Sequence, residues 1–338
     1  MVMVSAMKIL ALDTSCDESC AAVLDTDRWC LAADIVSSHA ARMKMWGGVV
    51  PEVASREHLK ALPLVIDAAL QEARMTMEEL NWIAVTNRPG LIGALLVGVS
   101  YAKALAFAGG ISFTAIDHVE AHLFSPLLAT FEGRETPPFP WVALIVSGGH
   151  TELFHVEGVG RFRWLGGTLD DAAGEAFDKA GKLLGLAYPA GPLLDSWVRD
   201  QGSPSDRAAF KFPRAKVAGL DFSFSGLKTA VRLAVEGKSP LTETSKLSIA
   251  ASAQEAIVDA LVEKTRLAHA QFPGTSLVVT GGVACNFRLR EKLPEAHFPA
   301  PKHCTDNAAM VALLAGLLHR EGKLTASPFS TSAMAQSI

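Results

Sequence analysis

Two histidines, His118 and His122, give the sharpest chemical signal in this sequence, within the segment HVEAH. Successive residues of an α-helix are rotated by about 100°, so positions i and i+4 lie on the same face. Two imidazoles on one helical face can bind a single divalent metal ion. The same spacing also occurs in ordinary surface or capping histidines, so the pair by itself leaves both interpretations open.

A metallopeptidase is a weak alternative for this pair. In the zinc-peptidase motif a glutamate directly follows the first histidine and acts as the general base. Here that position is Val119, and Glu120 points away from both histidines on a helix. The sequence also contains neither a GxxxxGK[ST] phosphate loop nor a CxxC pair for zinc.

Two glycine-rich turns each follow an apolar run. Ser147-Gly-Gly-His-Thr151 follows the run 142–146, and Thr280-Gly-Gly-Val-Ala-Cys-Asn286 follows the run 276–280. Backbone N–H groups in such turns can hold a phosphate or a developing oxyanion. A plain hairpin turn explains the first equally well, and a capping role explains Asn286. The residues alone therefore leave open whether each turn binds an anion or has only a structural role.

Charged residues gather in three further segments. Asp171, Glu175 and Asp178 would form one helical stripe, which is typical of a solvated face. Asp306 precedes an apolar helix at 308–318 and is placed to cap it. The most RNA-like surface segment alternates cations with aromatic rings: Arg207, Phe210, Lys211, Phe212, Arg214 and Lys216.

Composition narrows the class of protein. Of the 338 residues, 49% are hydrophobic and 20% charged, which excludes a disordered or low-complexity chain. The formal charge of −4 excludes a surface that is basic throughout, so any nucleic-acid contact must be a local patch or be shared with a partner. Five cysteines are too few for a disulfide framework.

The sequence predicts a cytoplasmic protein. Its N-terminal apolar run, 9–12, is too short for a signal peptide. The apolar segment 90–110 is long enough to span a bilayer, but it contains Lys103 and several glycines, so we expect a buried core helix and no membrane contact.

The elements that must position these residues occur twice. Apolar run, polar turn and apolar run recur at 9–24 and 142–156, and each predicts a β-hairpin. A strand, a glycine turn and a helix follow at 82–107 and again from 276. Such repetition indicates two duplicated α/β lobes. Further helices are expected at 55–71, 170–186, 191–199 and 247–271.

The proline-rich segment 132–140 predicts the boundary between the lobes. We expect a first lobe at 1–135 and a second at 136–320. Within the second, the helix 306–320 is expected to pack back on the first lobe. The C-terminal tail is expected at 321–338. Its part 324–338 is rich in Ser, Thr and Ala, and we expect that part to fray.

Together the motifs resemble the bacterial tRNA N6-adenosine threonylcarbamoyltransferase family, over about residues 8 to 320. Their order and spacing match throughout, which is more specific than any one motif. The motifs are ALDTSCDES, GGVVPEVASREH, HVEAH, LIVSGGHTEL, DDAAGEAFDKAGKLLG, DFSFSGLKTAV, TGGVACN and CTDNAAM.

The resemblance implies an α/β fold of two duplicated actin-like lobes, as in sugar kinases and Hsp70, with a cleft between them. It implies transfer of threonylcarbamoyl from threonylcarbamoyl-AMP to N6 of adenosine 37 in tRNAs that read codons beginning with A. His118, His122 and Asp306 would bind one Fe²⁺ or Zn²⁺ per subunit. An ATP- or AMP-type nucleotide in the cleft would be held by Ile145, Val146, Ser147, Gly148, Gly149, Asp178, Gly191, Asp195 and Asn286.

The same resemblance implies partners: tRNA, a shorter paralogue as heterodimer partner, a P-loop ATPase and a separate adenylate-forming enzyme. Two positions depart from the family pattern. Arg88 replaces a glycine of T-x-G-P-G-L, where it would narrow the approach of a phosphate or add a charge for it. Asp13 stands where many members carry glutamate, which would shift a hydrogen bond near the metal.

Two alternatives from other functional classes remain. A small-molecule kinase or ATPase of the same fold would share the glycine turns but would not need paired histidines with Asp306. A non-catalytic scaffold within the modification complex would be expected to lack the metal triad, whereas all three residues are present.

Overall fold

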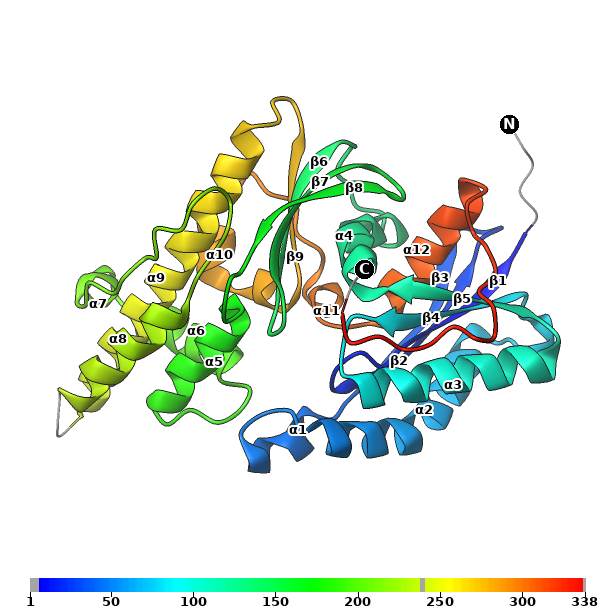
Figure 1. Cartoon of the computed structure of the whole chain (residues 1–338), viewed down its shortest axis with the longest axis horizontal. Coiled ribbons are helices and arrows are strands. Elements are labelled where there is room, and N and C mark those ends of the chain that lie inside the picture. The colour runs from blue at the N-terminus through cyan, green and yellow to red at the C-terminus, as the bar shows by residue number, and fades with distance from the viewer. Residues whose placement is uncertain (1–5, 238–240, 337–338) are drawn as a thin grey trace. The chain divides into compact units, whose positions relative to one another are not determined.

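The computed structural model describes residues 6–237 and 241–336. The chain divides into two compact units (Figure 1). Unit 1 contains Met1–Thr136 and Thr305–Ile338, and unit 2 contains Pro137–Cys304. The segment 305–320 therefore belongs to unit 1, so the chain leaves this unit once and returns to it.

Unit 1 is built on a five-stranded mixed sheet with the order β3-β2-β1-β4-β5. β1 pairs antiparallel with β2 and parallel with β4. The strands are β1 (Lys8–Asp13), β2 (Glu18–Asp25), β3 (Cys30–Ser38), β4 (Trp82–Arg88) and β5 (Ser112–Asp117). The helices are α1 (Ala40–Met43), α2 (Pro51–Ala73), α3 (Ile92–Gly109), α4 (His118–Phe124) and α12 (Ala308–Arg320), with 3₁₀ turns η1 (Lys44–Trp46), η2 (Met77–Glu79) and η3 (Ser125–Glu132).

Helices cover both faces of this sheet (Figure 1). α2 and α3 pack on one face, where Leu62 and Val99 share a core with Leu10 of β1. α12 packs against β1, β2 and α4 on the other face, close enough that a Cβ on Gly316 would lie 2.4 Å from Leu24. The positions of β1 and β2 that face α12 alternate with those that face α2, as the pleat requires.

Unit 2 repeats this plan with a four-stranded sheet in the order β8-β7-β6-β9. β6 pairs antiparallel with β7 and parallel with β9, which reproduces the pairing of β1 with β2 and β4. The strands are β6 (Trp141–Val146), β7 (Thr151–Gly158), β8 (Arg161–Gly167) and β9 (Ser276–Thr280). The helices are α5 (Ala173–Leu183), α6 (Ala190–Gln201), α7 (Pro204–Ala208), α8 (Ser225–Glu236), α9 (Glu243–Ala270), α10 (Phe287–Lys292) and α11 (Pro301–Cys304), with the 3₁₀ turn η4 (Gly282–Cys285).

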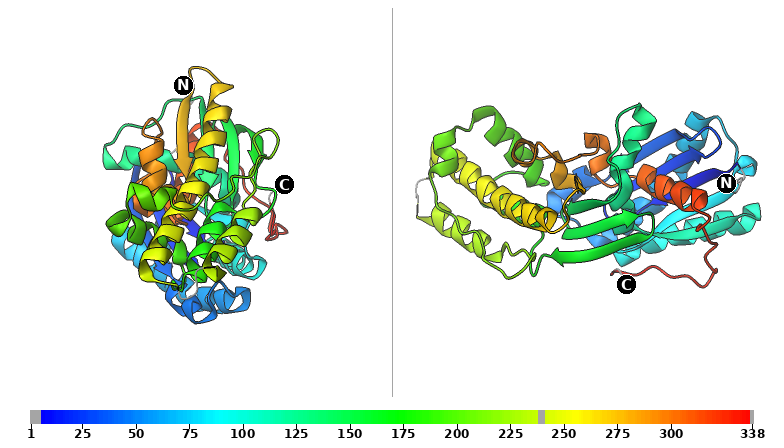
Figure 2. Two further views of the ribbon diagram at one scale, coloured as in Figure 1. Left: turned by 90° about the vertical axis from the view of Figure 1, so that its left-hand side faces the viewer. Right: turned by 90° about the horizontal axis from the view of Figure 1, so that it is seen from above.

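The long helix α9 is the central support of unit 2. Its residues Ile249, Ile257 and Leu261 are fully buried and share one core with β6, β9 and the helices α5, α6 and α8 (Figure 2). The expected hairpins, strand–turn–helix units and longer helices are all present, so the predicted fold class of duplicated α/β units is confirmed.

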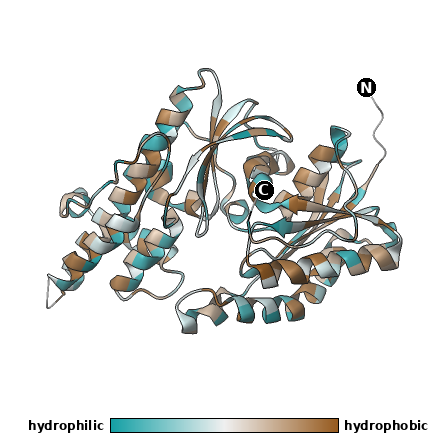
Figure 3. Ribbon diagram, in the orientation of Figure 1, coloured by the Kyte–Doolittle hydropathy of each residue, from teal (hydrophilic) through white to brown (hydrophobic). Residues whose placement is uncertain are grey.

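Two expectations need correction. Through residue 336, beyond which the tail lies outside the described residues, the C-terminal tail does not fray: Ser327 N–H donates to Phe113 O at 2.8 Å, and Met334 N–H donates to Asn87 O at 2.8 Å. The apolar helix α3 is only partly a core helix. Among the described residues it is the one helix long and apolar enough to cross a membrane, and much of its ribbon has the colour of hydrophobic residues (Figure 3). Leu95 and Val99 lie in the core, whereas Ile92 and Leu96 are exposed.

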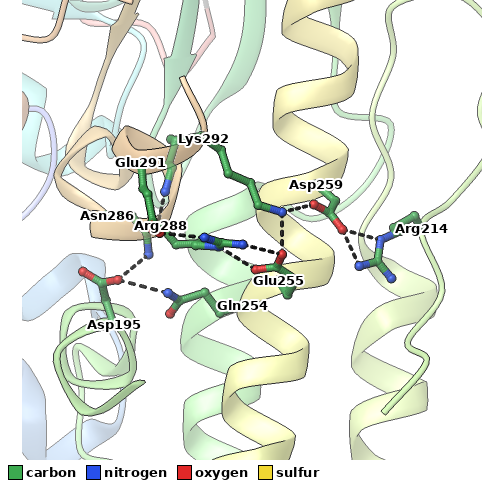
Figure 4. Close-up of polar contacts among 10 residues, drawn as sticks. Asp195, Arg214, Gln254, Glu255, Asp259, Asn286, Arg288, Glu291 and Lys292 are labelled. Atoms are coloured by element: carbon green, nitrogen blue, oxygen red, sulfur yellow. Dashed lines mark hydrogen bonds and ion pairs between the residues drawn. The ribbon is translucent and has the colours of Figure 1, made fainter. Parts of the chain in front are cut away.

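An ion-pair cluster ties α9 to α10 (Figure 4). Arg288 donates to both oxygens of Glu255 at 2.8 and 2.9 Å, and Lys292 donates to Glu255 at 2.5 Å. Burial raises the pKa of the Glu255 carboxyl, but Arg288 and Lys292 outweigh it and lower the pKa to about 2.

This pKa predicts how the stability of unit 2 depends on pH. A carboxyl with a depressed folded-state pKa stabilises fully above its unfolded value of about 4.3, and loses that contribution as the pH falls towards 2. We expect Glu255→Gln to lower the urea midpoint clearly at pH 7 and by about a third less at pH 3.5. Glu236→Gln at the exposed end of α8 is the control. An equal loss at both pH values would contradict the prediction.

Candidate functional site

The short helix α4 sets the position of the two histidines. The Asp117 side chain caps the helix by accepting from Val119 N–H at 2.9 Å and Glu120 N–H at 3.1 Å. Its other oxygen accepts from Arg88 Nε at 3.0 Å. The helix therefore begins at His118, and His122 lies one turn later on the same face, with the rings 4.6 Å apart. Arg88, the departure from the family pattern, supports this cap.

Asp306 joins the two histidines. Its Oδ1 lies 3.4 Å from His118 Nε2 and 3.3 Å from His122 Nε2. One ligand atom from each residue lies within 4.8 Å of the others. Both histidines are buried, while the Asp306 side chain is 21% exposed. The structure thus brings together the three residues expected to bind metal.

The expected capping role of Asp306 is wrong. The neighbouring Asn307 caps α12, since its side chain accepts from Met310 N–H at 2.9 Å. Because Asn307 accepts the hydrogen bond that caps α12, the Asp306 carboxylate remains available to the histidines.

Two side chains behind His118, those of Asp13 and Ser15, orient its ring. Its Nδ1 lies 3.0 Å from Asp13 Oδ2 and 3.2 Å from Ser15 Oγ. A carboxylate on the far nitrogen of a histidine fixes the tautomer that presents Nε2, an arrangement found repeatedly around metal-binding histidines. Asp13, the second departure from the family pattern, thus contacts the histidine directly.

Burial and charge act differently on the two imidazoles. Burial opposes protonation of His118, but Asp13 and Asp306 outweigh it and raise the pKa of His118. Burial lowers the pKa of His122, which keeps its ring in the neutral form that binds metals. Among the described residues, His122 Nδ1 is buried without a hydrogen-bond partner. Two imidazoles, one carboxylate and an oriented tautomer form a donor set that fits a divalent metal.

In unit 2 the glycine turn after β6 is closed by its own side chain. Ser147 Oγ accepts from Gly149 N–H at 3.3 Å and His150 N–H at 3.1 Å, and Ser147 N–H donates to His150 O. Gly148 N–H is the one backbone donor of this turn that no hydrogen bond occupies in the described part of the chain. Gly174 at the start of α5 lies against the turn, where a Cβ would come 2.6 Å from Ser147 O.

A chain of contacts leads from this turn through α5 and α6 to α10. Asp178 on α5 accepts from Gly191 N–H on α6 at 2.8 Å. Asp195 on α6 accepts from Asn286 Nδ2 at 3.0 Å and from Gln254 Nε2 at 3.2 Å (Figure 4). Burial raises the pKa of Asp195.

Both ends of the Asn286 side chain form a hydrogen bond. Its Oδ1 accepts from Leu289 N–H and so caps α10, as the simpler interpretation of the sequence had it. Its Nδ2 is engaged by Asp195. Gln254, buried on α9, was missed from the sequence because it lies far along the chain from both partners.

Two segments behave differently from their sequence pattern. The acidic stripe is not simply solvated, because Asp171 and Glu175 each pair with Lys179 at 2.7 Å. The RNA-like segment 207–216 buries Phe212 in the core of unit 2 and pairs Arg214 with Asp259. Its aromatic rings are therefore not presented for stacking on bases.

Comparisons with known proteins agree with these features. The family described as tRNA N6-adenosine threonylcarbamoyltransferase matches residues 30–313. A protein of that name from Pelobacter propionicus is 48% identical, over 91% of this chain and 91% of its own. One from Anaeromyxobacter is also 48% identical, over 91% and 93%. Another, from Chloroherpeton thalassium, is 45% identical over 97% of both chains.

Among solved structures, full-length HypF in a phosphate- and nucleotide-bound form is similar with a TM-score of 0.58 at 13% identity, covering 98% of this chain and 47% of that one. HypF from T. kodakarensis gives a TM-score of 0.58 at 14% identity, over 94% and 48%. At such identity these likenesses concern the fold alone.

Proposed function

Since the chain belongs to the tRNA N6-adenosine threonylcarbamoyltransferase family, we propose how its residues divide the work of that reaction. The enzyme transfers a threonylcarbamoyl group to N6 of an adenosine in tRNA. We propose that threonylcarbamoyl-AMP is the donor and that the target is adenosine 37 of tRNAs reading codons that begin with A.

The observation that carries the proposal is the His118–His122–Asp306 group with Asp13 behind it. We propose that these three residues hold one Fe²⁺ or Zn²⁺, metals that imidazole and carboxylate ligands suit. A bound metal with three protein ligands supplies a Lewis acid with open positions, which can orient and polarise the threonylcarbamoyl carbonyl. Asp13 holds the His118 ring in place through its Nδ1.

We assign the nucleotide part of the donor to unit 2. The turn formed by Ile145–Gly149 ends a buried strand, and the unoccupied Gly148 N–H can donate to a phosphate or to a developing oxyanion. The contact of Asp178 with Gly191 joins α5 to α6, and the contact of Asp195 with Asn286 joins α6 to α10. These contacts fix the helices beside the turn. AMP is a good leaving group, whereas the N6 amine of adenosine is a weak nucleophile. The main task of these residues is therefore to hold the carbonyl of the donor in position for attack by that amine.

We propose that the shorter paralogue covers an apolar face of unit 1 formed by α2 and α3. These helices approach closely, since a Cβ on Gly93 would lie 2.5 Å from Ser55 Oγ. Their outer faces expose Leu59, Leu64, Ile92 and Leu96. Exposed apolar patches of this kind mark protein contacts. A P-loop ATPase and an adenylate-forming enzyme complete the proposed cytoplasmic system.

The reaction itself can be tested directly. The purified chain is supplied with threonylcarbamoyl-AMP, its partner proteins and unmodified tRNA, and nucleosides from the digested tRNA are examined by mass spectrometry. We expect threonylcarbamoyladenosine from the wild type. If the same partners modify tRNA with another family member but not with this chain, the catalytic proposal fails and the scaffold or kinase alternative replaces it.

A further inference from the structure

The strand β8 exposes an unusual set of side chains at the edge of the sheet of unit 2. Arg161, Phe162, Arg163 and Trp164 follow one another and are all exposed. β8 is the last strand in the order β8-β7-β6-β9, so one of its edges has no partner among the described strands (Figure 1). Successive side chains of a strand alternate between faces, which gives the two arginines one face.

The arginine face is continued by rings from two other elements. Arg163 is paired across the ladder with His155 of β7, and the His155 ring stacks on Phe272 with centroids 4.1 Å apart. The Arg163 guanidinium lies over Phe272, 5.6 Å from its centroid. Together they surround an open pocket of ≈ 360 Å³, lined by His155, Glu157, Arg161, Phe162, Arg163 and Phe272.

The two arginines are not neutralised. In residues 6–237 and 241–336, neither Arg161 nor Arg163 forms an ion pair with a carboxylate. The carboxylate that lines the pocket, Glu157, lies instead 3.9 Å from His155 Nδ1. Other arginines of unit 2, such as Arg288, are engaged by acidic side chains. The pocket therefore carries an excess of positive charge beside the partly exposed rings of His155 and Phe272.

We propose that this β8 surface, defined as Arg161, Arg163, His155 and Phe272, binds the tRNA. The proposal rests on the proposed function, because it names a surface for the macromolecular substrate of that reaction. Guanidinium groups bind phosphates, and exposed rings stack on unpaired bases. On a chain of net charge −4, a local cationic surface is one of the two ways to hold RNA, the other being a surface shared with a partner. The segment 207–216 does not supply it, because it buries Phe212 and pairs Arg214.

The test compares variants in the complete reaction with partner proteins and saturating threonylcarbamoyl-AMP. We expect the double variant Arg161→Ala/Arg163→Ala to raise KM for tRNA on the order of tenfold, with kcat within about twofold. Its tRNA binding by filter retention should also depend less on salt, since removing one bond to a phosphate reduces the slope by about 0.7 to 0.9. Lys228→Ala/Arg232→Ala on α8 removes the same charge elsewhere on unit 2 and should change neither quantity.

Two single variants test the chemistry more finely. Phe272→Leu keeps an apolar side chain but removes the ring under Arg163, so KM for tRNA should rise several-fold, and Phe272→Tyr should restore it. Glu157→Gln removes the negative charge that lines the pocket and should lower KM for tRNA.

Some outcomes overturn the proposal. An unchanged KM for tRNA in the arginine double variant would do so, and so would an equal rise in the α8 control. If the double variant instead forms higher oligomers with KM unchanged, the arginines protect an edge strand or border a protein contact. Absence of product from the wild type would count against the proposed function, and the binding measurement would still decide the fate of the β8 surface.

Discussion

Replacing Asp306 by alanine should leave a folded protein that retains no stoichiometric metal and loses activity by about 10³-fold. The carboxylate lies within 3.4 Å of both histidine Nε2 atoms, so its removal takes away one of three ligands. The fold should survive because Asn307, not Asp306, caps α12. Metal content is measured by elemental analysis of protein purified under anaerobic conditions, and activity by threonylcarbamoyladenosine formed.

Two further variants distinguish a loss of metal binding from a loss of structure. Asn307→Ser keeps a capping oxygen and should keep both metal and activity. Asp13→Asn keeps an acceptor for His118 Nδ1 but removes its charge, so metal affinity should fall by about 10- to 100-fold without vanishing. An Asp306→Ala enzyme that binds metal and turns over normally would show that the His–His–Asp group does not serve catalysis.

Gly281→Ala should destabilise unit 2 by about 3 kcal/mol or more. Gly281 follows β9 with a φ of 95°, which residues with a side chain rarely adopt. A Cβ there would lie 2.4 Å from Val146 O, at the end of the neighbouring strand β6. The atoms that this Cβ would meet are backbone atoms of Val146, so no side-chain rotation relieves the clash and the chain itself must shift, directly after the Ile145–Thr280 pair.

Urea unfolding measures this destabilisation, with Gly148→Ala as the comparison. A Cβ on Gly148 meets nothing within 4 Å, so this variant should change stability by less than about 0.5 kcal/mol. If the two alanine variants unfold at the same urea concentration, close packing of Gly281 against Val146 is not a determinant of stability.

The sequence predicted the elements whose pattern is local. Hairpins, strand–turn–helix units and long helices carry their own periodicity, and each was placed within a few residues. β8 was not predicted because it contains no apolar run: cations and aromatic rings alternate over Arg161–Trp164, and all four residues are exposed at a sheet edge. β3 was missed for a similar reason, since few of its residues are buried.

The candidate site was predictable only where a motif holds several of its members. The spacing of His118 and His122 indicated a metal pair, but their contact with Asp306 spans most of the chain and came from the family resemblance. Whether Asp306 or Asn307 caps α12 could not be decided from composition, because both side chains are good caps. The contact of Gln254 with Asp195 depends on the packing of α9 against α6, which no local pattern records.

The discontinuity of unit 1 has a consequence for biosynthesis. Unit 2 is one uninterrupted stretch, whereas unit 1 needs Thr305–Ile338 to supply α12 and Asp306. A chain emerging from the ribosome can therefore complete unit 2 while unit 1 still lacks a helix on one face of its sheet. The whole of unit 2 is translated after His118 and His122 and before Asp306, the carboxylate that contacts them. At the proposed metal site, an ion can therefore find all three ligands only at the end of synthesis, and a chain terminated before Asp306 has no complete site.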